Sequence, residues 1–146
     1  MEIGTKLPYF ELKGCDLKTH SLVDVSDKSC ILILFICNHC PYVVAYLDRI
    51  NKLFRRYYED NLGVLLINSN DPAKYPVDSF EGMQALAKQY GWESIYLHDE
   101  TQEVARMFDA KRTPEAFLFN SSRELVYHGA IDDSWEQPNL VTRVYL

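Results

Sequence analysis

The sequence predicts an α/β domain with a mixed central sheet, helices on both faces and an N-terminal β-hairpin. Between residues 30 and 108, short apolar runs alternate with amphipathic helical stretches, an order that is typical of parallel strands joined by helical crossovers. The last two strand-like runs, 115–120 and 124–128, are separated only by a turn, so they are expected to form an antiparallel hairpin. A length of 146 residues fits one domain.

The first half of the chain predicts a hairpin, a strand and a helix. Residues 9–23 alternate weakly around a central glycine, which predicts a short hairpin. The run 30–35 is apolar without alternation, as expected for a strand covered on both faces. From Val43 to Tyr57, apolar residues recur at helical spacing with charged residues on the opposite side, which predicts a long amphipathic helix.

The second half continues the same alternation. A second buried strand is expected over 64–67, and a helix then ends at Gly91, with Asp78 and Glu81 at capping-box spacing near its start. The remaining predicted elements are a strand over 94–98, a helix over 101–108, the two strands of the closing hairpin, and a last helix over 138–146. That helix stops with the chain, so we expect a single domain over 1–146 that is shortened at its C-terminus.

Composition and charge exclude several classes of function. The chain has 21 acidic and 15 basic residues, a formal net charge of -6, and its basic residues form only isolated pairs, so nucleic acid is not an expected partner. Residues 30–36 form the longest strongly apolar run, far short of the roughly 20 residues that cross a bilayer. The N-terminus has no signal-peptide pattern. We therefore expect a cytoplasmic protein without membrane partners.

The strongest chemical signal is the sequence Cys37-Asn38-His39-Cys40. It lies where the first buried strand ends and the long helix starts, the edge of an open α/β sheet at which catalysis is usually found. Two intervening residues allow the sulfurs to form a disulfide, and the free N–H groups of a helix start stabilise a thiolate. We predict that Cys37, the more exposed sulfur, attacks disulfides and that Cys40 resolves the mixed disulfide.

Other interpretations of the cysteines and histidines stay open. A zinc site needs four ligands, but Cys15 and Cys30 do not form a second CxxC pair, so no metal is expected. Coincidental packing of Cys37 and Cys40 is a second alternative, and packing is the favoured interpretation for Cys15 and Cys30. His39 is either an exposed turn residue or a cation that tunes the thiolate pKa. The other histidines are interpreted as structural: His20, His98 and His128.

A second signal is the pair Thr113-Pro114, which directly precedes the strand that begins at Glu115. A proline at the start of a strand can simply occupy a position where no N–H donor is needed. Beside a CxxC pair, however, a cis Thr113–Pro114 bond would present backbone to the sulfurs and to a bound substrate. We therefore predict Thr113 and Pro114 as substrate-binding residues.

Four segments together resemble the peroxiredoxin-like branch of the thioredoxin superfamily, of the alkyl hydroperoxide reductase and thiol-specific antioxidant type. They are residues 37–43, 68–71, 113–115 and 129–133, and the opening residues 3–12 also look like the N-terminal hairpin of that branch. The resemblance covers nearly the whole chain. It implies a thioredoxin-like fold and a thiol–disulfide oxidoreductase that acts on protein or small-molecule thiols and disulfides. Its electrons reside in the cysteines, so it needs no organic cofactor, and the sequence does not identify its electron donor.

The sequence departs from the superfamily pattern at three positions. Thioredoxins have a buried carboxylate six positions before the first cysteine, where this chain has Ile31, so we name His39 and Glu115 as candidates for redox tuning and proton transfer. Peroxiredoxins carry a threonine where Cys37 stands and an activating arginine where Pro114 stands. A thiol-dependent peroxidase that uses Cys40 is therefore the second hypothesis, and a redox-inert binding domain with this fold is the third.

Overall fold

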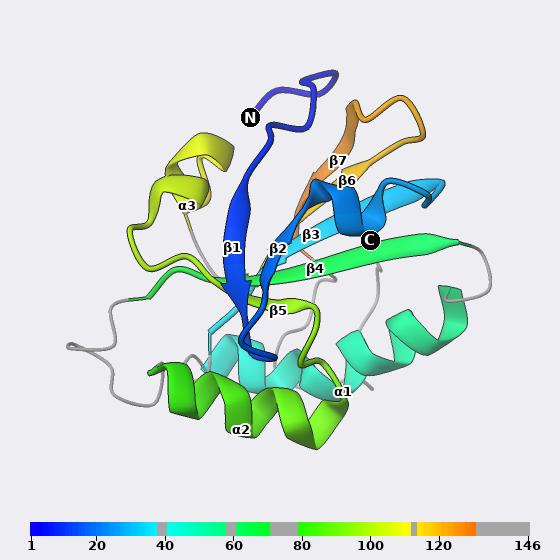
Figure 1. Cartoon of the computed structure of the whole chain (residues 1–146). Helices are drawn as coiled ribbons and strands as arrows, with labels where there is room; N and C mark the ends of the chain where they lie inside the picture. The colour runs from blue at the N-terminus through cyan, green and yellow to red at the C-terminus, as the bar shows by residue number, and fades with distance from the viewer. Residues whose placement is uncertain (38–40, 58–60, 71–78, 112–113, 131–146) are drawn as a thin grey trace.

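The computed structural model describes residues 1–37, 41–57, 61–70, 79–111 and 114–130, with the backbone alone at 41–46. The helix expected over 138–146 lies outside these residues. Figure 1 shows the arrangement: one twisted sheet runs through the molecule, with α1 and α2 on one face and α3 on the other.

The sheet has seven strands in the order β2-β1-β5-β4-β3-β6-β7. β3 pairs in parallel with β4, and β4 in parallel with β5, whereas β6 and β7 are antiparallel additions beside β3. The expected mixed sheet, N-terminal hairpin and closing hairpin are thereby confirmed. The strands are β1 (Glu11–Gly14), β2 (Thr19–Ser21), β3 (Cys30–Phe35), β4 (Leu62–Asn68), β5 (Tyr96–His98), β6 (Glu115–Phe119) and β7 (Leu125–Gly129).

Three helices and one short 3₁₀ turn cover the sheet. α1 (Pro41–Tyr57) and α2 (Phe80–Tyr90) lie on one face, while α3 (Glu103–Phe108) lies on the other (Figure 1). The 3₁₀ turn η1 (Leu22–Val25), which the sequence pattern did not predict, follows β2. The helices lie on both faces, as expected, so the inner strand β3 is covered on both faces.

β3 is the centre of the core, as its unbroken apolar run predicted. Ile31, Ile33 and Phe35 face one apolar cluster with α3, and Leu32 and Leu34 face the other with α1 and α2. All five side chains are at most 2% exposed. Burying each of them contributes about 1.5–3 kcal/mol to the free energy of folding, so this strand anchors the sequence that follows it.

Two local predictions need correction. The N-cap of α2 is Ser79, whose hydroxyl accepts a hydrogen bond from the amide of Gly82 at 3.1 Å, so the cap lies one residue after the predicted Asp78. Gly82 has no side chain with which to return the bond, so no capping box forms. β5 begins at Tyr96 instead of residue 94, because the amides of residues 95 and 96 both donate to the carbonyl of Trp92, at 3.0 and 2.9 Å.

Candidate active site

Polar side chains gather where the three parallel strands end. Cys37 follows β3, Asn68 closes β4 and Asp99 follows β5, so all three lie at one edge of the sheet. Glu115 opens the antiparallel strand β6 and is paired with Phe35, which brings it to the same edge. Ligands and catalytic groups of α/β proteins are found at this edge.

Cys37 lies buried beside the sheet. The preceding residue, Ile36, extends the pairing of β3 by donating its amide to the carbonyl of Ile67 at 2.9 Å. α1 begins at Pro41, so the expected position between strand and helix is confirmed. The side chain of Cys37 is only 1% exposed and packs within the cluster under α1. The apolar cluster thus covers the Cys37 side chain, whereas its exposure relative to Cys40, which lies outside the described residues, stays a prediction.

Glu115 is a buried carboxylate with two polar neighbours. Its two oxygens lie 3.3 and 3.4 Å from the amide of Lys111, and Oε2 lies 3.3 Å from Nε2 of His128. The imidazole stacks on the ring of Phe117 with centroids 4.5 Å apart and an interplanar angle of 12°. Glu115 is 5% exposed, and these neighbours offset the cost of burying its charge. His128, which the sequence suggested was merely structural, thus contacts a candidate site residue.

Asp99 and Asn68 give this edge its rigidity. Asp99 is fully buried, and its carboxylate accepts the hydroxyl of Ser69 at 2.7 Å and the amides of Val104 and Ala105 at 3.3 and 2.9 Å. It therefore satisfies N–H groups at the start of α3. The amide nitrogen of Asn68 donates to the hydroxyl of the Tyr96 side chain at 3.1 Å. Neither side chain was predicted as a site residue, although both directly follow expected strands.

Several predicted site residues lie outside the described residues: Asn38, His39, Cys40 and Thr113. Pro114 is half-buried directly before β6, and Ile31, at the position of the thioredoxin carboxylate, is buried in the apolar core. Of the predicted set, the described structure therefore brings Cys37, Pro114 and Glu115 to one edge. Within the described residues, no group of three or more His, Cys, Asp or Glu side chains is arranged so that it could hold a metal ion.

The remaining cysteines differ from Cys37 in their place in the fold. Both are free thiols, Cys15 buried in the turn between β1 and β2 and Cys30 half-buried at the start of β3. Burial, and then the negative charges of Asp16 and Glu93, raise the pKa of Cys15 to about 12. That thiol is almost entirely protonated at neutral pH, which fits a packing role.

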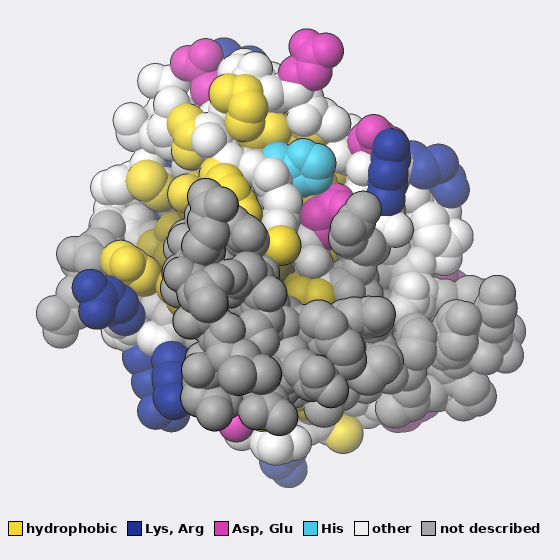
Figure 2. Space-filling model, turned by 180° about the vertical axis from the view of Figure 1, so that it is seen from behind, with side chains coloured by type: hydrophobic (Ala, Val, Ile, Leu, Met, Phe, Trp, Pro, Cys, Tyr) yellow, Lys and Arg dark blue, Asp and Glu magenta, His cyan; other side chains and the backbone are white. Residues whose placement is uncertain are grey.

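On the face shown in Figure 2, basic side chains are dispersed around the periphery and alternate with acidic ones. No helix in the described part of the chain is long and apolar enough to cross a bilayer.

Two solved structures are similar to this chain in both fold and sequence. A hypothetical protein from Sinorhizobium meliloti 1021 is 35% identical with a TM-score of 0.89, and the match covers 99% of this chain and 78% of that one. An uncharacterized conserved protein from Geobacillus kaustophilus is 39% identical with a TM-score of 0.87, over 94% of this chain and 72% of that one.

A more distant structure supports the fold alone. A thiol:disulfide interchange protein of the thioredoxin family from Chlorobium tepidum TLS is 15% identical with a TM-score of 0.73, over 92% of this chain and 91% of that one. No curated protein matches the chain. The model of the AhpC/TSA family matches residues 3–128. The resemblance noted in the sequence is thereby confirmed, and the chain belongs to the AhpC/TSA family, with a thioredoxin-like fold.

Proposed function

We propose that this protein is a thiol–disulfide oxidoreductase in which Cys37 attacks and Cys40 resolves. One observation carries the proposal: Cys37 follows the strand β3, before α1 begins at Pro41, and β3 pairs with a strand that opens with the buried carboxylate of Glu115. Family membership supports a function in thiol redox chemistry. The CxxC spacing supports disulfide exchange as its form.

The reaction balances within the cysteine pair and a substrate disulfide. The Cys37 thiolate attacks one substrate sulfur, forms a mixed disulfide and releases the other sulfur as a thiolate. The Cys40 thiolate then attacks the sulfur of Cys37, which forms the internal disulfide and releases the second substrate thiolate. Two electrons pass to the substrate, and an external thiol must return them to the cysteine pair.

Glu115 is proposed to accept the proton that the Cys40 thiol loses during resolution. A carboxylate buried at the same edge can take up a proton without leaving its site, and the Lys111 amide and His128 hold its oxygens. Ile31 supplies no such group. His128 is a positioning residue here, since it contacts the carboxylate rather than a reacting sulfur.

Substrate access is the second requirement of the proposal. Pro114, half-buried before β6, together with Thr113 is proposed to dock the substrate backbone, as the sequence pattern suggested. Because the Cys37 side chain is 1% exposed, its sulfur must become accessible when a substrate docks. Alkylation of Cys37 by iodoacetamide, followed by mass spectrometry, measures this access directly.

The decisive experiment uses Cys40→Ser, which removes the resolving step. Incubated with glutathione disulfide, this variant should accumulate a stable mixed disulfide on Cys37 in nearly stoichiometric yield. Cys37→Ser should form none at position 37 and should not reduce the disulfide. Cys15→Ser and Cys30→Ser serve as matched controls that keep wild-type behaviour.

Two other outcomes would favour the competing hypotheses. Rapid sulfenic acid formation on Cys40 in Cys37→Ser treated with hydrogen peroxide, without a trapped disulfide in Cys40→Ser, would identify a peroxidase. If Cys37 and Cys40 of the wild-type protein form no reversible disulfide, the hypothesis of a redox-inert binding domain is favoured.

A further inference from the structure

The end of the sheet opposite Cys37 contains a groove that the redox chemistry does not use. It has a volume of about 810 Å³ and lies beside the first half of β4, from Leu62 to Leu65. The strand runs seven residues, 62 to 68, from this groove to the candidate active edge, a span of roughly 20 Å. The two sites are therefore separate.

The groove exists because β5 is short. β3 pairs with β4 from Leu62 onward, but β5 pairs with it only from Leu66 to Asn68. Before β5, the chain turns back on Trp92 instead of continuing along β4. The first half of β4 consequently has a strand on one side and the groove on the other.

This gap exposes an edge of the sheet within the molecule. The Leu66 amide donates toward β5, to the carbonyl of Ile95, at 2.8 Å. Peptide groups of alternate residues point to the same side of a strand, so those of Val64 and Leu62 face the groove. Among the described residues, the β4–β5 ladder that would satisfy them ends at Leu66. A strand edge with free N–H and C=O groups is a template for another extended chain.

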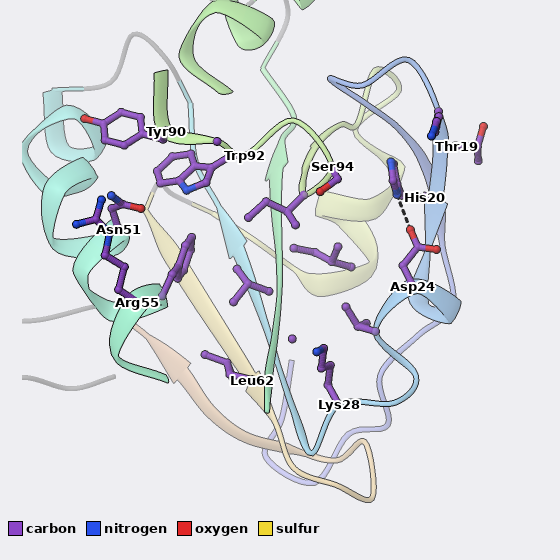
Figure 3. A pocket seen from close by; sticks show the side chains of 18 residues that line it. Thr19, His20, Asp24, Lys28, Asn51, Arg55, Leu62, Tyr90, Trp92 and Ser94 are labelled. Carbon is purple, nitrogen blue, oxygen red and sulfur yellow. Dashed lines mark hydrogen bonds and ion pairs between the residues drawn. The ribbon is translucent and has the colours of Figure 1, made fainter. Parts of the chain in front are cut away.

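The walls of the groove fit an extended segment. On one side stand Asn51 and Arg55 of α1 with the aromatic rings of Tyr90 and Trp92, which stack with centroids 4.6 Å apart (Figure 3). η1 and the residues after it close the other side: a Cβ on Gly63 would lie 2.9 Å from Cγ of the Lys28 side chain. Residues 62 to 65 of β4 line the groove between these walls, the length of a short added strand.

The charges that line the groove are mainly positive, although the chain has a net charge of -6. Lys18, Lys28 and Arg55 line it, and within the described residues none forms an ion pair with a carboxylate. Asp24, the one acidic residue among the described lining, is bonded to His20 (Figure 3). Arg55 and Lys28 lie on opposite sides of β4 in that view, so both faces of an added strand would meet a cation.

We propose that this groove binds an acidic, extended segment of a partner protein by strand addition to Leu62–Val64. Main-chain bonds to β4 would supply the register, and glutamate or aspartate side chains would meet Lys18, Lys28 and Arg55. The inference does not depend on the proposed redox function, because the described residues that line the groove include no cysteine. Binding is therefore expected to survive in Cys37→Ser.

The test titrates the full chain with a capped peptide in which glutamate and valine alternate, followed by NMR and amide hydrogen exchange. On saturation, exchange at the Val64 amide should slow at least about tenfold, because a new hydrogen bond protects it. Exchange at Leu66, which is already bonded, should change less than about twofold. A peptide in which lysine replaces glutamate should bind at least about tenfold more weakly.

A pair of double variants separates local from overall charge. Lys28→Glu with Arg55→Glu should weaken binding of the glutamate peptide at least about twentyfold. Lys52→Glu with Lys88→Glu changes the net charge equally at exposed positions outside the groove, and should change affinity less than about twofold. Circular dichroism confirms that both variants fold.

Several results would overturn the proposal. These are equal binding of the two peptides, equal weakening by the two double variants, or absence of binding at millimolar peptide. Binding that leaves Val64 exchange unchanged would contradict strand addition. Full displacement of the peptide by inorganic pyrophosphate, with no protection of Val64 by the peptide, would identify a simple anion site instead.

Discussion

The two ends of the parallel strands are built in opposite ways. At the carboxyl end, the buried polar side chains of Asn68, Asp99 and Glu115 all have hydrogen-bond partners, and the thiol of Cys37 is enclosed. At the amino end, β4 has an open edge and the cations beside it have no carboxylate partners among the described residues. The first arrangement holds reacting groups in fixed positions, as catalysis requires. The second leaves polar groups free for a partner.

Two thiols allow the sharpest test of this contrast, since Cys37 lies at the carboxyl end and Cys15 near the amino end. With the pKa of Cys15 raised from 9.0 to about 12, its thiolate fraction at pH 8 falls about a thousandfold. We expect iodoacetamide to alkylate Cys15 slower by that factor than an ordinary thiol, as measured by mass spectrometry. In urea, Cys15 should react as fast as Cys30. Rapid labelling of Cys15 in the folded protein would contradict the contrast.

The rigidity of the carboxyl end depends on Asp99. Asp99→Ala leaves the amides of Val104 and Ala105 and the hydroxyl of Ser69 without their acceptor. We expect the free energy of unfolding to fall by about 3 kcal/mol, as measured by urea denaturation. Glu100→Ala, at the exposed neighbouring position, should change it by less than about 0.5 kcal/mol. Equal losses in both variants would show that Asp99 does not hold this edge.

The role of the buried carboxylate is tested by Glu115→Gln, which keeps the shape and removes the charge. If Glu115 accepts a proton during resolution, the rate of disulfide exchange at pH 7 should fall about thirtyfold, and its dependence on pH should flatten. His128→Asn should shift the pH profile and lower the rate less. Glu124→Gln, whose carboxylate lies 3.9 Å from Lys6 on the surface, is the matched control. A pH profile unchanged in Glu115→Gln would remove this residue from the mechanism.

The smallest expected effect concerns the wall of the amino-terminal groove. Burial opposes protonation of His20, but hydrogen bonds to Asp16 and Asp24 outweigh it and raise the pKa of His20. The raised pKa stabilises the fold fully below the ordinary value of 6.5, and this contribution disappears as pH rises through the folded-state pKa.

His20→Gln should therefore lower the free energy of unfolding by about 1 kcal/mol at pH 6. This is less than the loss expected for a buried ion pair, because the Asp24 side chain is 41% exposed and solvent screens the interaction. The difference from wild type should shrink toward pH 9. Urea denaturation at both values measures it, with Lys18→Gln as a nearby control on the same turn. A difference that grows with pH would contradict the charge interaction.

Much of the fold and the location of the site followed from local sequence patterns. The unbroken apolar run predicted β3, helical spacing predicted α1, and Gly91 ends α2 in the left-handed conformation that glycine favours, with φ of 73°. Since Cys37 stands directly between the first two of these elements, its place at the strand–helix junction was also predictable. Such features depend on neighbours along the chain, so the sequence contains them directly.

Contacts between distant segments were decided only by the tertiary structure. The burial of Cys37, the contact between Glu115 and His128, and the use of Asp99 to cap α3 depend on which elements pack together. The groove depends on where β5 begins. Hydrogen bonds to the Trp92 carbonyl hold residues 94 and 95 in a turn, although the sequence pattern favours a strand there. The periodicity of apolar residues indicates which side of an element is apolar. Burial, strand pairing and open strand edges, in contrast, are properties of the assembled sheet.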